Sequence, residues 1–249
     1  MNSSFLRILN DPPLDGPTNM ARDEALLEAV GRGAAPPTLR LYEWAAPTVS
    51  LGYFQKIDDF DALPPPAGRL YVVRRPTGGG AILHDRELTY ALALPAAHPL
   101  LAGGPNALYA LVHDAVIACL NACGAGAWRG CESDGSSAAR GPFFCFARRH
   151  CFDVLVDRDK IAGSAQRRTR TALLQHGSII TGSRFDQQPT AVVPWNVKEI
   201  TRRLRTDLVI ALSDATGLDA QAGGWTVEEL SRAEELLIKY AGSVWTRRT

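Results

Sequence analysis

Strand-like segments fill the middle of this chain and helix-like segments its two flanks, and this order limits the possible folds more than any other feature. Segments of alternating or β-rich composition are residues 39–44, 48–52, 70–75, 81–94, 152–156 and 172–180. Segments with apolar residues at helical spacing are residues 19–30, 106–123 and much of the chain from 196 onward. Because strands and helices do not alternate strictly, we expect an α+β fold with a mixed β-sheet flanked by helices.

Two local boundaries can also be predicted. The first helix is expected to be capped near Thr18 or Asn19, because both side chains can accept a hydrogen bond from a free backbone N–H. Residues 124–142 are rich in Gly, Ala and Ser and are expected to form a loop. No internal repeat divides the chain, so a single domain over residues 1–249 is predicted.

Net charge and cysteine content indicate which kinds of partner and which cellular compartment to expect. A formal net charge of +1 favours neither nucleic acid nor an anionic membrane as a partner. Five cysteines, an odd number in a chain too long to need a disulfide scaffold, favour a reducing compartment. The N-terminus lacks the basic and apolar segments of a signal peptide. We therefore expect a cytoplasmic protein.

A run of three glycines, Gly78, Gly79 and Gly80, follows the strand-like residues 70–75. Glycines at these positions allow a ligand to approach the backbone closely, and Arg75 beside them can hold an anionic group. The segment lacks the spacing of a P-loop or of a dinucleotide-binding motif, so neither nucleotide fold is supported. The alternative from composition is a plain glycine-rich hairpin turn.

A second motif joins Lys160 to small residues at 163–165 and to residues 175–178. The small residues leave room for a ligand, and the lysine could present its charge to a carbonyl, a phosphate or a thiolate. Only four of the 27 basic residues are lysines, which makes a lysine inside a polar motif a candidate for a specific role. From spacing alone, a solvated turn lysine is the alternative.

Cys145 is a candidate nucleophile because it lies between aromatic residues and is followed closely by Arg148, Arg149 and His150. Neighbouring cations favour the thiolate, which is the reactive form of cysteine. The alternative is a buried, inert thiol. A zinc site built from Cys131, Cys145, His150 and Cys151 is disfavoured, because no C-x-x-C pair is present.

Together these segments resemble the biotin/lipoate ligase and octanoyltransferase superfamily, in particular its lipoate–protein ligases and cysteine-dependent octanoyltransferases. The similarity follows nearly the whole chain in the right order. The matching stretches are residues 19–24, 47–55, 74–81, 160–167 and 174–178, followed by Lys239, Tyr240 and Trp245 near the C-terminus.

The resemblance implies a biotin/lipoate ligase-like catalytic domain in which two segments form the walls of the acyl pocket. The residues implied to bind substrate are Arg75, Thr77, Gly78, Gly79, Gly80, Ala81 and His84 on one wall, and Gly163, Ser164, Ala165, His176 and Gly177 on the other. The cysteine that precedes the lysine motif in a C-F context corresponds to Cys145 of Cys145–Phe146, and the lysine that stabilises its thiolate corresponds to Lys160.

The function implied is transfer of an octanoyl or lipoyl group from acyl carrier protein to a lysine of a lipoyl-domain protein, such as glycine-cleavage H protein or an E2 subunit. No metal or other cofactor is expected. The alternatives are an ATP-dependent lipoate–protein ligase, which would use ATP and Mg²⁺, and a non-catalytic lipoyl-domain binder. Residues 147–150 depart from the family pattern of proline and serine, and Cys151 provides a second thiol close by.

Overall fold

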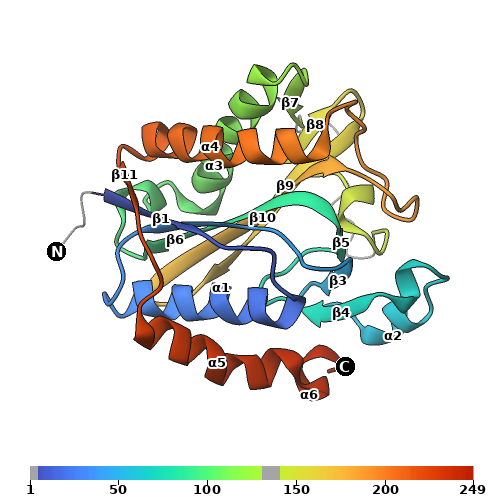
Figure 1. Ribbon diagram of the computed structural model, residues 1–249, viewed down its shortest axis with the longest axis horizontal. Helices are drawn as coiled ribbons and strands as arrows, with labels where there is room; N and C mark the ends of the chain where they lie inside the picture. Colours follow the sequence, from blue (N-terminus) through green and yellow to red (C-terminus); the bar gives the residue numbers. More distant parts are fainter. Residues whose placement is uncertain (1–4, 131–140, 249) are drawn as a thin grey trace.

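The computed structural model describes residues 5–130 and 141–248, in which helices enclose a mixed sheet (Figure 1). The helices are α1 Gly16–Gly31, α2 Ile57–Asp61, α3 Gly104–Ala122, α4 Val197–Thr216, α5 Val227–Ala241 and α6 Ser243–Thr246, with 3₁₀ turns at Ala67–Arg69, Pro99–Leu101 and Cys145–Ala147. The strands are β1 Phe5–Asn10, β2 Thr38–Tyr42, β3 Thr48–Leu51, β4 Tyr71–Arg74, β5 Ile82–His84, β6 Arg86–Pro95, β7 Ala127–Arg129, β8 Val154–Val156, β9 Asp159–Arg168, β10 Ala172–Gly182 and β11 Asp219–Ala222.

Within the described residues, the strands form two sheets. The larger has eight strands in the order β11-β1-β2-β6-β10-β9-β8-β7, and the smaller has the order β4-β3-β5. Strand β1 is parallel to both neighbours, whereas β2, β6, β10, β9, β8 and β7 pair antiparallel. The predicted α+β fold with a mixed, helix-flanked sheet is confirmed.

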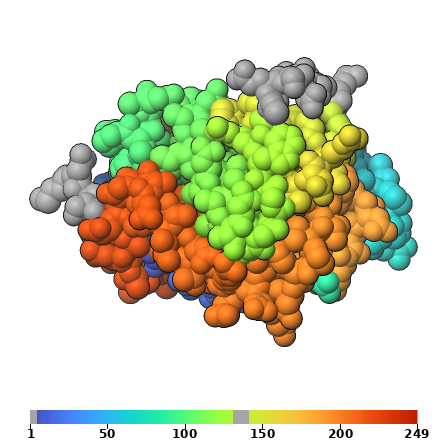
Figure 2. Space-filling model, turned by 90° about the horizontal axis from the view of Figure 1, so that it is seen from above, coloured from blue at the N-terminus to red at the C-terminus, as the bar shows by residue number. Residues whose placement is uncertain are grey.

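The large sheet is covered on both faces. Helices α3 and α4 lie over one face, and α1 and α5 lie over the other (Figure 1). Figure 2 looks onto the first layer and shows the segments of α3 (green) and α4 (orange) side by side. Strand β2 illustrates the alternation, because Leu39 and Leu41 pack toward α3 and α4 while Tyr42 packs toward α1 and α5.

The two sheets meet where the sequence motifs lie. The glycine run connects β4 to β5 in the small sheet, at residues 75–81. Lys160 and Gly163 lie on β9, and His176 and Gly177 lie on the adjacent strand β10. The fold therefore brings both motifs to one region, although about 80 residues separate them in the sequence.

Several local predictions were wrong or incomplete. Helix α1 begins at Gly16, and Asp15 caps it by accepting a hydrogen bond from Thr18 N at 2.8 Å, with Pro17 in the first turn. Strands β1 and β11 were not predicted. The expected extended run over residues 81–94 is two strands, β5 and β6. The expected loop over residues 124–142 contains the short strand β7, and its residues 131–140 lie outside the described part.

Among the residues described, no helix is both long enough and apolar enough to cross a bilayer.

Candidate active site

Cys145 begins a 3₁₀ turn that is anchored to the end of the glycine run. Its backbone N–H donates to Ala81 O at 2.7 Å, and Ala81 N donates to Phe143 O at 3.0 Å. Phe144 and Phe146 on either side are buried, whereas Cys145 itself is partly exposed. The buried aromatic side chains thus hold a partly accessible thiol beside the glycine run.

Lys160 is the cation closest to this thiol. Its Nζ lies 3.4 Å from Cys145 Sγ and 2.7 Å from Asp153 Oδ1. The side chain is 3% exposed, so its alternative interpretation as a solvated turn residue is wrong. Burial opposes the charge, but Cys145 and Asp153 outweigh that effect and raise the pKa of Lys160 above its usual value. The lysine is therefore an ammonium at neutral pH, and it places a positive charge 3.4 Å from Cys145 Sγ.

Asp153 is a member of the site that the sequence did not reveal. Its Oδ1 binds Lys160, and its Oδ2 accepts a hydrogen bond from His150 N at 2.9 Å, so both carboxylate oxygens are engaged. The only signal in the sequence was an aspartate within the strand-like residues 152–156, where acidic residues are uncommon. Asp153 fixes the direction from which the ammonium reaches the sulfur.

Gly163 is required because the Lys160 side chain crosses it. A Cβ atom at Gly163 would lie 2.4 Å from Lys160 Cε and 2.7 Å from its Nζ. Gly80 has a similar role on the other side, where a Cβ would lie 3.0 Å from Cys145 N and 2.8 Å from Arg148 Nε. The glycines of the two motifs thus allow Lys160 and Cys145 to meet.

Arg75 holds the glycine run in place by binding two of its carbonyl oxygens. The residue is 3% exposed, and its Nη2 donates to the carbonyl oxygens of Gly78 and Gly80, each at 2.7 Å. Among the described residues, no acceptor takes the backbone N–H groups of Gly78, Gly79 or Gly80. These N–H groups are candidates for stabilising an oxyanion near Cys145.

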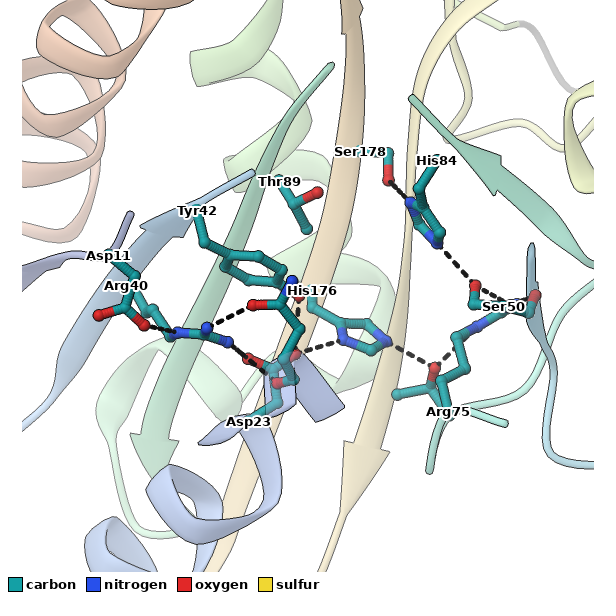
Figure 3. Close-up of polar contacts among 12 residues, drawn as sticks. Asp11, Asp23, Arg40, Tyr42, Ser50, Arg75, His84, Thr89, His176 and Ser178 are labelled. Carbon is teal, nitrogen blue, oxygen red and sulfur yellow. Dashed lines mark hydrogen bonds and ion pairs between the residues drawn. The ribbon is translucent and has the colours of Figure 1, made fainter. Parts of the chain in front are cut away.

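A small pocket lies beside this region, with free space for little more than one water molecule. Its lining residues are Met20, Tyr42, Trp44, Ser50, Arg75, Ile82, His84, Thr89, Ala165, His176, Gly177 and Ser178. Many of these side chains are polar, but their polar atoms are bonded within the protein, as Figure 3 shows for Ser50, His84 and His176. For example, Ser178 Oγ and Thr89 Oγ1 both donate to Glu87 Oε1, and the Trp44 ring stacks on His84 with centroids 3.8 Å apart. The surface left facing the pocket is mainly apolar.

The family resemblance implies an acyl group as substrate, and filling this pocket should then alter acyl-chain selection. Ala165→Leu adds three carbons to the wall formed by β9, so we expect kcat/KM for an octanoyl thioester to fall about 10- to 100-fold. A butanoyl thioester should lose much less, because it reaches less far into the pocket. Steady-state kinetics with both thioesters measures this ratio. An equal loss for both donors would show that this pocket does not hold the chain.

Ser164 is engaged within the protein. Its Oγ contacts His113 Nε2 at 2.7 Å and accepts from Gln175 Nε2 at 3.1 Å. His113 comes from α3 and its Nδ1 contacts Phe152 O, so it links α3 to the segment that carries Asp153. The hydroxyl of Ser164 therefore supports the site through α3.

Acid should destabilise the protein through His113. Burial lowers the pKa of His113 from 6.5 to about 4, so the unfolded chain takes up a proton first as the pH falls. This contribution to stability is complete above pH 6.5 and is lost progressively between pH 6.5 and 4. We expect urea denaturation to show a loss of about 2 kcal/mol between pH 7 and 5. His113→Gln should be less stable at pH 7 but lose less over this interval; an unchanged pH dependence would contradict this origin.

The other thiols lie elsewhere. Cys119 and Cys123 belong to α3 and the residue that follows it, and burial raises the pKa of both. The Sγ of Cys151 lies 3.7 Å from His150 Nδ1. Cys131, named in the zinc hypothesis, lies outside the described residues. In the described part of the chain, no group of three or more His, Cys, Asp or Glu side chains is placed to hold a metal ion.

The chain is similar to known proteins in both sequence and fold. The family described as "Lipoyl protein ligase A/B catalytic domain" matches residues 15–232. Octanoyltransferase LipM of Kyrpidia tusciae is 35% identical over 92% of this chain and 94% of that protein. Octanoyltransferase LipM of Moorella thermoacetica is 33% identical over the full length of both.

The structure is similar to Ta0514, a putative lipoate protein ligase from T. acidophilum, with a TM-score of 0.78, 24% identity, and coverage of 99% and 100% of the two chains. It is also similar to lipoate-protein ligase A bound with ATP, with a TM-score of 0.75, 22% identity, and coverage of 98% of each chain.

Proposed function

Because the chain belongs to the lipoyl protein ligase A/B catalytic-domain family, we propose that it is an octanoyltransferase that carries the acyl group on Cys145. The chain is an acyltransferase, and its similar relatives are octanoyltransferases. The observation that carries the proposal is the 3.4 Å contact between Lys160 Nζ and Cys145 Sγ, close to the glycine run, whose N–H groups have no acceptor among the described residues. An adenylate-forming ligase has no need of a thiol paired with an ammonium.

In the first half of the reaction, the donor is the thioester of octanoyl-acyl carrier protein. The Cys145 thiolate attacks the carbonyl carbon, and a tetrahedral oxyanion forms near the N–H groups of Gly78–Gly80. The bond between the carbonyl carbon and the donor sulfur then breaks. The departing thiolate takes up a proton from solvent, and the octanoyl group remains on Cys145 as a thioester.

In the second half, the acceptor is a lysine amine of a lipoyl-domain protein, such as glycine-cleavage H protein or an E2 subunit. The neutral amine attacks the thioester carbon, the carbon–sulfur bond breaks, and the amine nitrogen loses a proton to solvent. The product is an amide, and the released Cys145 thiolate is again stabilised by Lys160. The cycle requires no metal, nucleotide or other cofactor, and we place it in the cytoplasm.

One incubation tests the proposal against its alternatives. Purified protein is mixed with octanoyl-acyl carrier protein without ATP, and the adduct is located by mass spectrometry of peptides. We expect a mass increase on Cys145, also in Cys151→Ser, and transfer of that mass to a lipoyl domain added later. Product formed only with ATP, Mg²⁺ and free octanoate would assign the protein as a ligase. Turnover under neither condition would leave a non-catalytic binding role.

A further inference from the structure

Arg75 is the point at which two buried hydrogen-bond chains meet (Figure 3). Its Nη2 holds the glycine run, as described above. Its Nε donates to Thr77 Oγ1 at 3.2 Å, and its Nη1 donates to Ser50 O at 2.9 Å and to Ser50 Oγ at 3.2 Å. Every nitrogen of the guanidinium therefore has protein acceptors. Arg75 has no remaining donor for a substrate carboxyl group.

The first chain runs from α1 to Thr77. Asp23 Oδ2 contacts His176 Nδ1 at 2.9 Å, and His176 Nε2 contacts Thr77 Oγ1 at 2.7 Å. A carboxylate accepts hydrogen bonds, so Nδ1 carries a proton. With the proton on Nδ1, Nε2 accepts from the Thr77 hydroxyl, and the Thr77 oxygen accepts from Arg75 Nε. Arg40 and Tyr42 also bind Asp23 and so fix the end of this hydrogen-bond chain that is farthest from Arg75.

The second chain has the same order of groups and comes from β6. Glu87 Oε1 contacts His84 Nδ1 at 2.8 Å, and His84 Nε2 contacts Ser50 Oγ at 2.7 Å. Burial lowers the pKa of His84 despite the opposing effect of Glu87, so the ring is neutral at pH 7. Its Nε2 accepts from the Ser50 hydroxyl, and Arg75 Nη1 donates to the same oxygen. The two chains reach different nitrogens of one guanidinium.

We propose that Arg75 is a positioning residue, held by the two carboxylate–histidine–hydroxyl chains so that its Nη2 fixes the carbonyl oxygens of Gly78 and Gly80. In each hydrogen-bond chain, a histidine ring and a hydroxyl lie between the carboxylate and the guanidinium of Arg75. A carboxylate bound directly to Arg75 would occupy the Nη2 donors that hold the run. With both carbonyls tied to Arg75, the run keeps the conformation in which its N–H groups have no acceptor among the described residues. His84 and His176 thus act on the backbone of the glycine run and not on the substrate as acid or base.

Thr77→Val tests this role, because it removes the hydroxyl that joins His176 to Arg75 and keeps the side-chain shape. Two backbone hydrogen bonds report on the two ends of the glycine run. Tyr53 N donates to Thr77 O at 2.8 Å, just before the run, and Ala81 N, just after it, donates to Phe143 O. We expect hydrogen exchange of both amides to be about tenfold faster in Thr77→Val. Single-turnover acylation of Cys145 by octanoyl-acyl carrier protein should slow about 10- to 100-fold. Alkylation of Cys145 by iodoacetamide should stay within about twofold, because the Lys160 contact is not touched.

The chain offers a matched control. Thr38 Oγ1 accepts a hydrogen bond from Arg7 Nε at 3.1 Å, which is the same kind of contact at a distance from the site. Thr38→Val should leave exchange of the Tyr53 and Ala81 amides and acylation of Cys145 unchanged. Thr77→Ser keeps the hydroxyl and should recover protection of both amides.

A double-mutant cycle tests whether two substitutions break the same hydrogen-bond chain or different ones. Thr77→Val and His176→Gln break the same chain, so their combined effect on exchange should be close to that of the larger single effect. Thr77→Val and Ser50→Ala break different chains, and their effects should add. Unchanged exchange in Thr77→Val and Ser50→Ala would overturn the proposal, as would slow acylation with normal exchange. The kinetic measurement rests on the proposed octanoyl transfer, whereas the exchange measurement needs no substrate and tests the role of Arg75 even if that function fails.

Discussion

Cys145→Ser is expected to lower the rate of octanoyl transfer at least about 10⁴-fold, which is the scale of losing a covalent nucleophile. The serine hydroxyl occupies nearly the same space but does not ionise beside Lys160 at neutral pH. No acyl adduct should then appear on residue 145, and transfer to the lipoyl domain should stop. Quantitative mass spectrometry of the lipoyl domain measures the rate over the required range.

The matched control is Cys151→Ser, which removes the thiol six residues away. It should keep transfer within about twofold of the unchanged protein, because no contact of Cys151 reaches Lys160 among the described residues. Circular dichroism and thermal unfolding should show that Cys145→Ser is folded. Transfer that continues in Cys145→Ser at more than about one part in a hundred would exclude a thioester on this residue.

Lys160→Met is expected to have the second largest effect, on activity and on stability together. Removing the ammonium leaves the Cys145 thiolate without its cation, and we expect transfer to fall about 10²- to 10³-fold. It also leaves the Asp153 carboxylate buried without a cation to balance its charge, since Asp153 is 6% exposed. Breaking one side of a buried ion pair should lower the free energy of unfolding by about 3–5 kcal/mol. Enzyme kinetics and urea denaturation measure the two losses separately.

A second substitution distinguishes the catalytic loss from the structural one. Lys160→Met combined with Asp153→Asn removes the unpaired charge and keeps an acceptor for His150 N. The double variant should regain most of the lost stability, because the buried site is neutral again. Transfer should stay low, because the thiolate still has no cation. If transfer returns together with stability, Lys160 serves the fold and not the chemistry.

Much of the fold could be predicted where periodicity is strong. The strand-like run over residues 172–180 lies within β10, and the helical spacing over residues 106–123 corresponds to α3. Strand β11 was missed because all four of its residues are exposed, so no alternation marks it. Strand β1 was missed because its side chains are buried in succession from Leu6 to Leu9, without the alternation of a half-buried strand. Such strands are recognised by their partners in the sheet, which local sequence does not specify.

The sequence by itself identified the residues of the two motifs, the glycine run and the segment that begins at Lys160, and the family that they resemble. Lys160 and Gly163 lie three residues apart on β9, so the sequence placed them near each other, but only the structure showed that the lysine side chain crosses the glycine. Only the tertiary structure decided which groups meet. Asp23 and His176 are 153 residues apart, and Thr77 and His176 are 99 apart, yet each pair is in hydrogen-bond contact. Strand order and register produce these contacts, because they place the glycine run, α1 and β10 against one another. The sequence supplied Arg75 as a cation beside glycines, and the fold made it the shared end of two buried hydrogen-bond chains.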